Sequence, residues 1–192
     1  MITIADTGGA NLNSVVNALK RIGVEYKFAN TKEDLARAEK ILLPGVGAAR
    51  EAMQRLENQG VVDTLRNIKV PVLGICLGMQ LLYESSDEGD VECLGVIPGK
   101  VVSIKNTGLS LPHMGWNKIM IEKGGIFDFC DGEYVYFVHS FRADMNEHVQ
   151  LYTNYGEEIP ALVQKDNFYG AQFHPEKSAD IGEKILKRFI EI

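Results

Sequence analysis

A cysteine flanked by two glycines is the residue of this sequence best placed for nucleophilic chemistry. Cys76 lies in Gly74-Ile-Cys-Leu-Gly78, between the apolar run Val72 to Ile75 and a stretch of helical pattern. This order is typical of a nucleophile elbow, a tight strand-to-helix turn in which larger flanking side chains would collide with each other or with a substrate. The adjacent helix N-terminus favours the thiolate, the nucleophilic form. The alternative is a buried structural cysteine that precedes a helix.

A cysteine nucleophile needs a base and a group that orients the base. Of the four histidines, His174 stands out because it ends a strand-like run and is followed by Pro175 and Glu176. Proline restricts its own φ and biases the preceding residue toward an extended conformation, so the two polar side chains keep a defined relation. Glu176 can accept a hydrogen bond from one imidazole nitrogen while the other nitrogen faces the thiol. The predicted triad is therefore Cys76, His174 and Glu176.

An acyl-transfer site also needs hydrogen-bond donors for the oxyanion. The backbone amide of Leu77, directly after the cysteine, is one candidate. The segment Pro44-Gly-Val-Gly47 ends a predicted strand, and its glycines permit a second backbone N–H to approach the substrate. Taken alone, this segment indicates only a turn.

The first half of the chain predicts the elements that position these residues. Strands are predicted at 2–6, 26–29, 40–43 and 72–75, and helices at 12–22, 31–38, 48–56 and 61–68. Strands that alternate with helices form a mostly parallel sheet covered on both faces. Such sheets bind ligands at the carboxyl ends of their strands, which is where Cys76 lies.

The second half favours an antiparallel addition to this sheet. Strand-like runs at 101–104, 134–138 and 168–173 are separated by turn residues and are interpreted as a meander at the sheet edge, and a last helix is predicted over 178–192. The predicted fold class is α/β: three layers, with a flavodoxin-like, mostly parallel sheet, helices on both faces and an added antiparallel β meander. Without repeats or linkers, residues 1–192 are expected to form a single domain.

Composition narrows the classes of function. The chain has 192 residues, 45% of them hydrophobic, and a formal net charge of −6 without a dense basic cluster, which argues against a nucleic-acid-binding scaffold. It has no apolar run that could cross a bilayer and no signal-peptide pattern, so we expect a cytoplasmic protein without membrane association. Its three cysteines lack a C-x-x-C pair, which argues against a disulfide framework or a zinc site, and we expect neither a metal nor a cofactor.

Taken together, the motifs resemble those of the triad-class glutamine amidotransferase family, nearly end to end. The resemblance rests on Cys-Leu-Gly-Met-Gln at 76–80, Pro-Gly-Val-Gly at 44–47 and Phe-His-Pro-Glu at 173–176. Within the family, the block His-Met-Gly-Trp-Asn at 113–117 is similar to that of the glutaminase subunits of imidazole glycerol phosphate synthase. The resemblance implies that Cys76 attacks the side-chain amide of L-glutamine, that His174 carries the proton to departing ammonia and then activates water, and that Glu176 orients His174. It also implies a glutamine pocket made by Gly45, Val46, Leu77, Gln80, Ser140 and Phe141.

The same resemblance implies a partner. A (β/α)8-barrel synthase needs about 250 residues, so we expect the acceptor chemistry to lie on another polypeptide. The resemblance identifies this partner as the HisF cyclase subunit, which in a heterodimer uses the ammonia to form imidazole glycerol phosphate and an aminoimidazole carboxamide ribotide in histidine biosynthesis. Asn11, Trp116 and Lys177 are predicted at the partner interface, unless Trp116 is a core residue and Lys177 is merely solvated.

Two other functions share parts of the pattern. A cysteine hydrolase or chaperone of the related class would keep the fold and the thiol without an ammonia-using partner, and Gln80 and the His-Pro-Glu sequence argue against it. A non-catalytic flavodoxin-like binding module would fit the charge and the α/β pattern, but it would require an inert Cys76. Partner stimulation and alkylation by a glutamine mimic discriminate between these functions.

Overall fold

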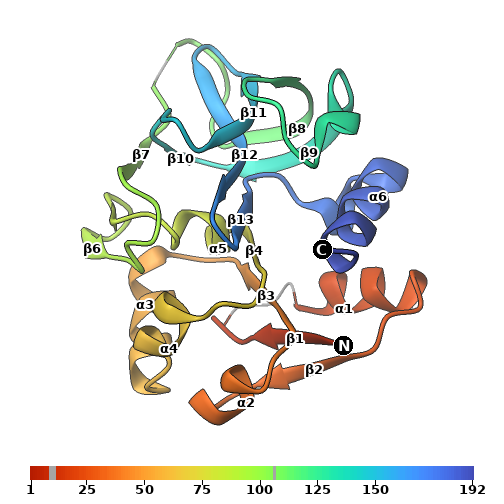
Figure 1. The fold of residues 1–192 in the computed structure, drawn as a ribbon. Helices are drawn as coiled ribbons and strands as arrows, with labels where there is room; N and C mark the ends of the chain where they lie inside the picture. The colour runs from red at the N-terminus through yellow and green to blue at the C-terminus, as the bar shows by residue number, and fades with distance from the viewer. Residues whose placement is uncertain (9–11, 106) are drawn as a thin grey trace.

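The computed structural model describes residues 1–8, 12–105 and 107–192 (Figure 1). A nine-stranded sheet runs through it in the order β2-β1-β3-β4-β13-β12-β11-β8-β9. Its first five strands are parallel: β2 (Tyr26–Ala29), β1 (Ile2–Ala5), β3 (Lys40–Gly45), β4 (Val72–Cys76) and β13 (Phe168–Ala171). The predicted parallel core is therefore confirmed, and both the elbow and the His174 segment lie at strand ends within it.

Helices cover both faces of this parallel core (Figure 1). α1 (Leu12–Arg21) and α6 (Ala179–Ile190) bury their apolar residues against one face, and α2 (Lys32–Ala36), α3 (Ala49–Asn58) and α4 (Val62–Asn67) bury theirs against the other. Successive strand residues alternate between the two layers, as Ile41 and Leu42 do. Strands buried on both sides must be apolar throughout, which explains the continuous apolar runs in the sequence.

Local signals set the ends of several helices. Gly23 follows α1 with a φ of 73°, a conformation that glycine adopts without strain. Thr31 caps α2, because its side chain accepts a hydrogen bond from the backbone N–H of Asp34 and the Asp34 carboxylate binds the Thr31 backbone in return. α2 is shorter than predicted, since the chain tightens into an i→i−3 turn in which Ala38 N–H donates to Leu35 C=O.

The antiparallel addition is also confirmed. Its strands are β12 (Glu158–Lys165), β11 (Val149–Asn154), β8 (His113–Ile121) and β9 (Tyr134–His139). The run at 168–173 is not at the sheet edge, because β13 lies between β4 and β12 and pairs in parallel with β4. This position brings His174, three residues beyond β13, back to the end of β4.

The prediction that the run at 101–104 belongs to the meander is wrong. This run forms β7 (Lys100–Ser103), which belongs to a separate four-stranded sheet with β10 (Phe141–Ala143), β5 (Ser85–Ser86) and β6 (Val91–Glu92). Short 3₁₀ turns lie at η1 (Asp128–Cys130) and η2 (Pro175–Lys177). Among the described residues, no helix is both long enough and apolar enough to cross a membrane.

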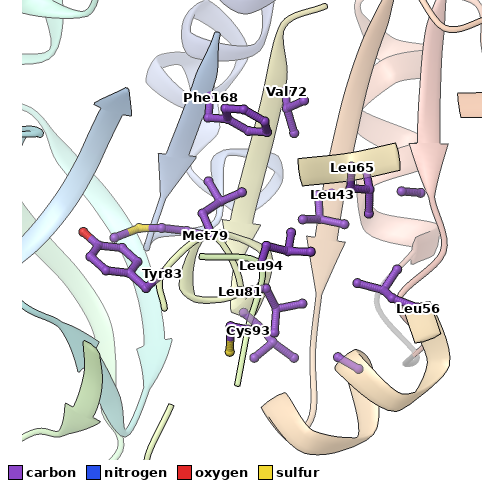
Figure 2. Packing of buried hydrophobic residues seen from close by; sticks show 14 of the residues in the cluster. Leu43, Leu56, Leu65, Val72, Met79, Leu81, Tyr83, Cys93, Leu94 and Phe168 are labelled. Carbon is purple, nitrogen blue, oxygen red and sulfur yellow. The ribbon is translucent and has the colours of Figure 1, made fainter. Parts of the chain in front are cut away.

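The segment after the elbow is anchored in the core on the α3 and α4 side. α5 (Leu77–Gln80) follows β4 directly, and Met79, Leu81 and Tyr83 are fully buried among the apolar side chains of this core (Figure 2). Burial of such side chains stabilises the fold by roughly 1.5–3 kcal/mol each. The turn that carries Cys76 is therefore held rigidly from its helical side.

Candidate active site

The backbone at Cys76 makes the sharp turn that the glycine-flanked pattern predicts. Its φ is 52° and its ψ is −109°, a conformation that residues with side chains rarely adopt. β4 ends at this residue and α5 begins at the next. The cysteine is 8% exposed and lines a cavity at the carboxyl end of the sheet. Local strain of this kind persists where the surrounding packing holds it, and it is common at active sites.

Backbone packing explains both flanking glycines. A Cβ atom at Gly74 would lie 2.5 Å from the carbonyl oxygen of Gly78, which is the collision that the sequence predicts. A Cβ atom at Gly78 would instead overlap the carbonyl oxygen of Leu43 in the neighbouring strand β3. These obstacles are backbone atoms, which cannot turn aside as a flexible side chain could. The elbow is therefore locked between β3 and α5.

His174 and Glu176 form a buried pair at the same strand ends. Nδ1 of His174 and Oε1 of Glu176 are 2.7 Å apart, and the two side chains are 2% and 0% exposed. Ser178 fixes the backbone here, because its hydroxyl donates to the His174 carbonyl oxygen at 2.7 Å and accepts from the Tyr136 N–H at 3.0 Å. With Nδ1 held by the carboxylate, Nε2 is the nitrogen left for chemistry in the cavity.

The charge state of His174 follows from its neighbours. Burial by itself lowers the pKa of His174, but interactions with Cys76 and Glu176 outweigh it and raise the pKa to about 10. The imidazole is therefore protonated at neutral pH. A protonated imidazole beside a cysteine stabilises the thiolate nucleophile and is ready to give its proton to a leaving group.

Two buried glutamines support the nucleophile from the other side. Nε2 of Gln172 donates to Sγ of Cys76 at 3.7 Å, and Nε2 of Gln80 donates to Oε1 of Gln172 at 2.9 Å and to the Phe141 carbonyl oxygen at 2.9 Å. Sequence reasoning missed Gln172. The sequence shows only a polar residue inside the strand-like run before His174, and its burial is visible only in the structure.

The cavity has a volume of about 500 Å³. Cys76, His174 and five of the six predicted pocket residues line it: Val46, Leu77, Gln80, Ser140 and Phe141. Gly45 does not line this cavity; it pairs with Cys76 in the sheet, and a Cβ atom there would lie 2.9 Å from the Gly78 nitrogen. Within the described ranges, no group of three or more His, Cys, Asp or Glu residues could hold a metal ion.

Glu88 also lines the cavity, although no sequence pattern marks it. Its carboxylate accepts a hydrogen bond from the Ala49 backbone N–H at 3.3 Å. Burial raises the pKa of Glu88 and the Ala49 N–H counteracts this, while the nearby Glu51 charge adds to the increase. A partly buried carboxylate at this place can bind a positively charged group of a ligand.

Two of the three predicted interface residues are described, and both lie beside Tyr136. Trp116 is 49% exposed and is therefore not a core residue, and its ring meets the edge of the Tyr136 ring at 6.1 Å. Lys177 lines the cavity, and its Nζ lies 5.9 Å from the Tyr136 ring centroid. Asn11 lies outside the described residues.

Comparison with known proteins places this site in a family. The sequence profile of the class-I glutamine amidotransferases matches residues 3–192. The chain belongs to the class-I glutamine amidotransferase family. A relative from Idiomarina loihiensis, imidazole glycerol phosphate synthase subunit HisH, is 44% identical over 191 residues, 100% of this chain and 97% of the relative. The subunit HisH of Haemophilus influenzae is 46% identical over 99% of this chain and 96% of the relative.

Solved structures show the same fold for this amidotransferase. A crystal structure of a glutamine amidotransferase superposes with a TM-score of 0.77 at 21% identity, covering 99% of this chain and 97% of the other. The structure of PurLQS from Thermotoga maritima gives a TM-score of 0.74 at 20% identity, with coverage of 99% and 97%. The family match and the HisH relatives show that the chain is a glutamine amidotransferase enzyme. A cysteine nucleophile is characteristic of this family.

Proposed function

We propose that this amidotransferase is the glutaminase subunit of imidazole glycerol phosphate synthase in the cytoplasm. It hydrolyses L-glutamine to glutamate and ammonia and passes the ammonia to the HisF cyclase subunit for histidine biosynthesis. The observation that carries the proposal is the identity of 44% to 46% to HisH subunits over essentially the full length of both chains. The site supplies a chemical route for the first half of this reaction.

In the first step, the Cys76 thiolate attacks the side-chain carbonyl carbon of glutamine. A C–S bond forms, and the carbonyl electron pair moves onto the oxygen. The Leu77 N–H and an N–H of the 44–47 segment stabilise this oxyanion, which contributes several kcal/mol in acyl-transfer enzymes. The intermediate then collapses, the C–N bond breaks, and the His174 imidazolium gives its proton to the departing ammonia. A thioester on Cys76 remains.

In the second step, water attacks the thioester. The neutral His174 takes a proton from the water, a second oxyanion forms, and its collapse breaks the C–S bond. Glutamate leaves, and the imidazolium beside the Cys76 thiolate is restored. Glu176 keeps the ring in one orientation throughout and stabilises its charged form, as the third member of a triad does.

The pocket offers contacts for the amino-acid end of glutamine. Both amide hydrogens of Gln80 are donated within the protein, so this side chain can offer the substrate only its oxygen. Glu88 adds a carboxylate to the same cavity. Two acceptors suit the α-ammonium group, and Ser140 and Phe141 also line the cavity.

The partner would bind at the mouth of the site, where we place Asn11, Trp116 and Lys177. Free ammonia in water is lost to the synthase, so a site that is fully organised only in the complex is an advantage. The 44–47 segment is the part best suited to such a change. The Thr7 hydroxyl donates a 2.5 Å hydrogen bond to the carbonyl of Pro44 and so holds the start of this segment. At the end of the segment, Gly47 has a φ of 99°, which only glycine adopts freely.

Glutamate release by the chain alone and with HisF tests this proposal. We expect slow hydrolysis by the isolated chain and clear acceleration in the complex. Equal rates would refute the regulation by the partner and favour a partner-independent hydrolase. A chain that hydrolyses no glutamine in either state, and whose Cys76 resists a glutamine-mimicking alkylating agent, would be a non-catalytic binding module.

A further inference from the structure

A buried histidine pair lies at the proposed glutamine pocket, and His139 of this pair lines the cavity. His113 begins β8, His139 ends β9, and the two residues are opposite each other in the sheet. They are 1% and 6% exposed, and His113 Nδ1 lies 2.9 Å from His139 Nε2. The reaction steps above use neither residue. Two imidazoles buried at the edge of the site therefore need another explanation.

The hydrogen bonds determine where the protons of this pair lie. The Phe141 carbonyl oxygen can only accept, so Nδ1 of His139, at 2.8 Å, carries a hydrogen. Burial lowers the pKa of His139 to about 3 and that of His113 to about 4, so both rings are neutral at pH 7. The Nε2 of a neutral His139 must then accept, and His113 Nδ1 donates to it. The Phe141 carbonyl thereby fixes the tautomer of His139, and the donation from His113 reinforces it.

Aromatic rings keep His113 in place independently of this hydrogen bond. Its ring stacks on Tyr155, with centroids 4.0 Å apart and an interplanar angle of 19°, and on Phe137, at 4.7 Å and 21°. An aromatic hydrocarbon would fill the same space. The imidazole is therefore required for its donor atom rather than for its shape.

The Phe141 carbonyl oxygen connects the pair to the nucleophile. It accepts hydrogen bonds from both His139 and Gln80. From Gln80 the hydrogen bonds continue through Gln172 to the sulfur of Cys76, with each donor and acceptor in a consistent role. The neighbouring Ser140 carbonyl accepts from the Ile104 N–H at 2.9 Å. Both carbonyls of the Ser140–Phe141 turn are thus held in place.

We propose that His113 and His139 are positioning residues that hold the Ser140–Phe141 turn in the geometry that binds glutamine. The proposal rests on the glutaminase function proposed above and assigns a role to two residues outside the triad. His113 also begins the strand that carries the exposed Met114 and Trp116. The pair therefore joins the proposed partner face to the glutamine pocket.

Substitutions that remove the ring nitrogens or replace one of them test this role in the complex with the cyclase. His139→Leu removes both hydrogen bonds, and we expect the KM for glutamine to rise by about tenfold or more, because the Phe141 carbonyl loses one of its two donors and the buried His113 donor loses its acceptor. His139→Asn places an amide nitrogen near the position of Nδ1, so it should recover most of this loss. His113→Phe keeps the stacking but removes the donor, and it should raise KM by a smaller factor.

Two further measurements separate positioning from folding. Synthesis from added ammonium should be unchanged in every variant, and His148→Leu, at a histidine outside the cavity lining, should keep the parental KM. Imidazole ¹⁵N shifts should show the Nδ1–H tautomer of His139 in the parent. An Nε2–H tautomer of His139 in the parent, or equal defects in His139→Leu and His139→Asn, would overturn the positioning role. A parent complex that hydrolyses no glutamine would instead overturn the proposed function.

Discussion

The buried histidine pair makes the stability of this protein depend on pH. An ordinary histidine has a pKa of 6.5, and burial lowers that of His113 to about 4 and that of His139 to about 3. Acidification from pH 7 to pH 5 therefore protonates both residues in the unfolded chain but neither in the folded protein. The unfolded state binds more protons in this range, so the free energy of unfolding must fall as the pH falls.

The size of this effect follows from the pKa differences. Between 6.5 and 5 there are about 1.5 pH units at about 1.36 kcal/mol each, which gives about 2 kcal/mol per histidine and about 4 kcal/mol for the pair. His174 acts in the opposite direction, because its pKa is raised to about 10. Its stabilisation is complete below 6.5 and is lost as the pH rises toward 10, so it offsets only about 1 kcal/mol of the decrease between pH 7 and pH 5.

Urea unfolding at pH 7 and pH 5 measures this difference. We expect the parent to lose about 3 kcal/mol, a large part of the 5–15 kcal/mol that stabilises typical domains. The double variant His113→Gln, His139→Asn has no titrating pair, so its stability should change little or rise slightly over the same range. Equal losses of unfolding free energy in the parent and the double variant would refute the reasoning. Protonation of either ring in the folded parent above pH 5, as detected by NMR, would also refute it.

Further substitutions test the elbow, the triad and the interface. Gly78→Ala should abolish soluble folded protein, because the new methyl group overlaps the backbone of strand β3. The control Gly124→Ala should fold, because its methyl group meets only a side chain at 3.4 Å. A folded, active Gly78→Ala protein would contradict the elbow packing. His174→Asn should reduce glutamine hydrolysis more than Glu176→Gln, because it removes the proton carrier rather than its orienting group, and the reverse order in kcat would contradict the assigned roles. Trp116→Ala should change the free energy of unfolding by no more than about 0.5 kcal/mol, as is usual for an exposed position, but it should weaken binding to the cyclase in a titration. An unchanged affinity would remove Trp116 from the interface.

Local patterns were sufficient to predict the parallel core. The strands at 26–29 and 40–43, the capping residue Thr31 and the terminating Gly23 all express preferences of a few neighbouring residues. The same holds for the contact between Gly74 and Gly78 at the elbow, whereas the contact of Gly78 with Leu43 in β3 involves a distant segment. Such features depend on short segments, so the sequence displays them directly.

Features that depend on distant contacts were not predictable in this way. The run at 168–173 has the composition of a meander strand, and only its pairing with β4 shows that it belongs to the parallel core. The run at 101–104 pairs with β10, some 40 residues later in the chain. Gln172, Glu88 and the histidine pair acquire their places in or behind the pocket from segments far apart in sequence, so no local spacing announces them.

The role of Cys76 is the centre of this account, and one substitution tests it most directly. In the complex with the cyclase, Cys76→Ala should abolish product formation from glutamine and leave product formation from added ammonium at the parental rate. The thiol serves only to release ammonia, and the acceptor chemistry lies on the other subunit. Glutamine-dependent turnover that survives in Cys76→Ala would contradict the assignment of the nucleophile.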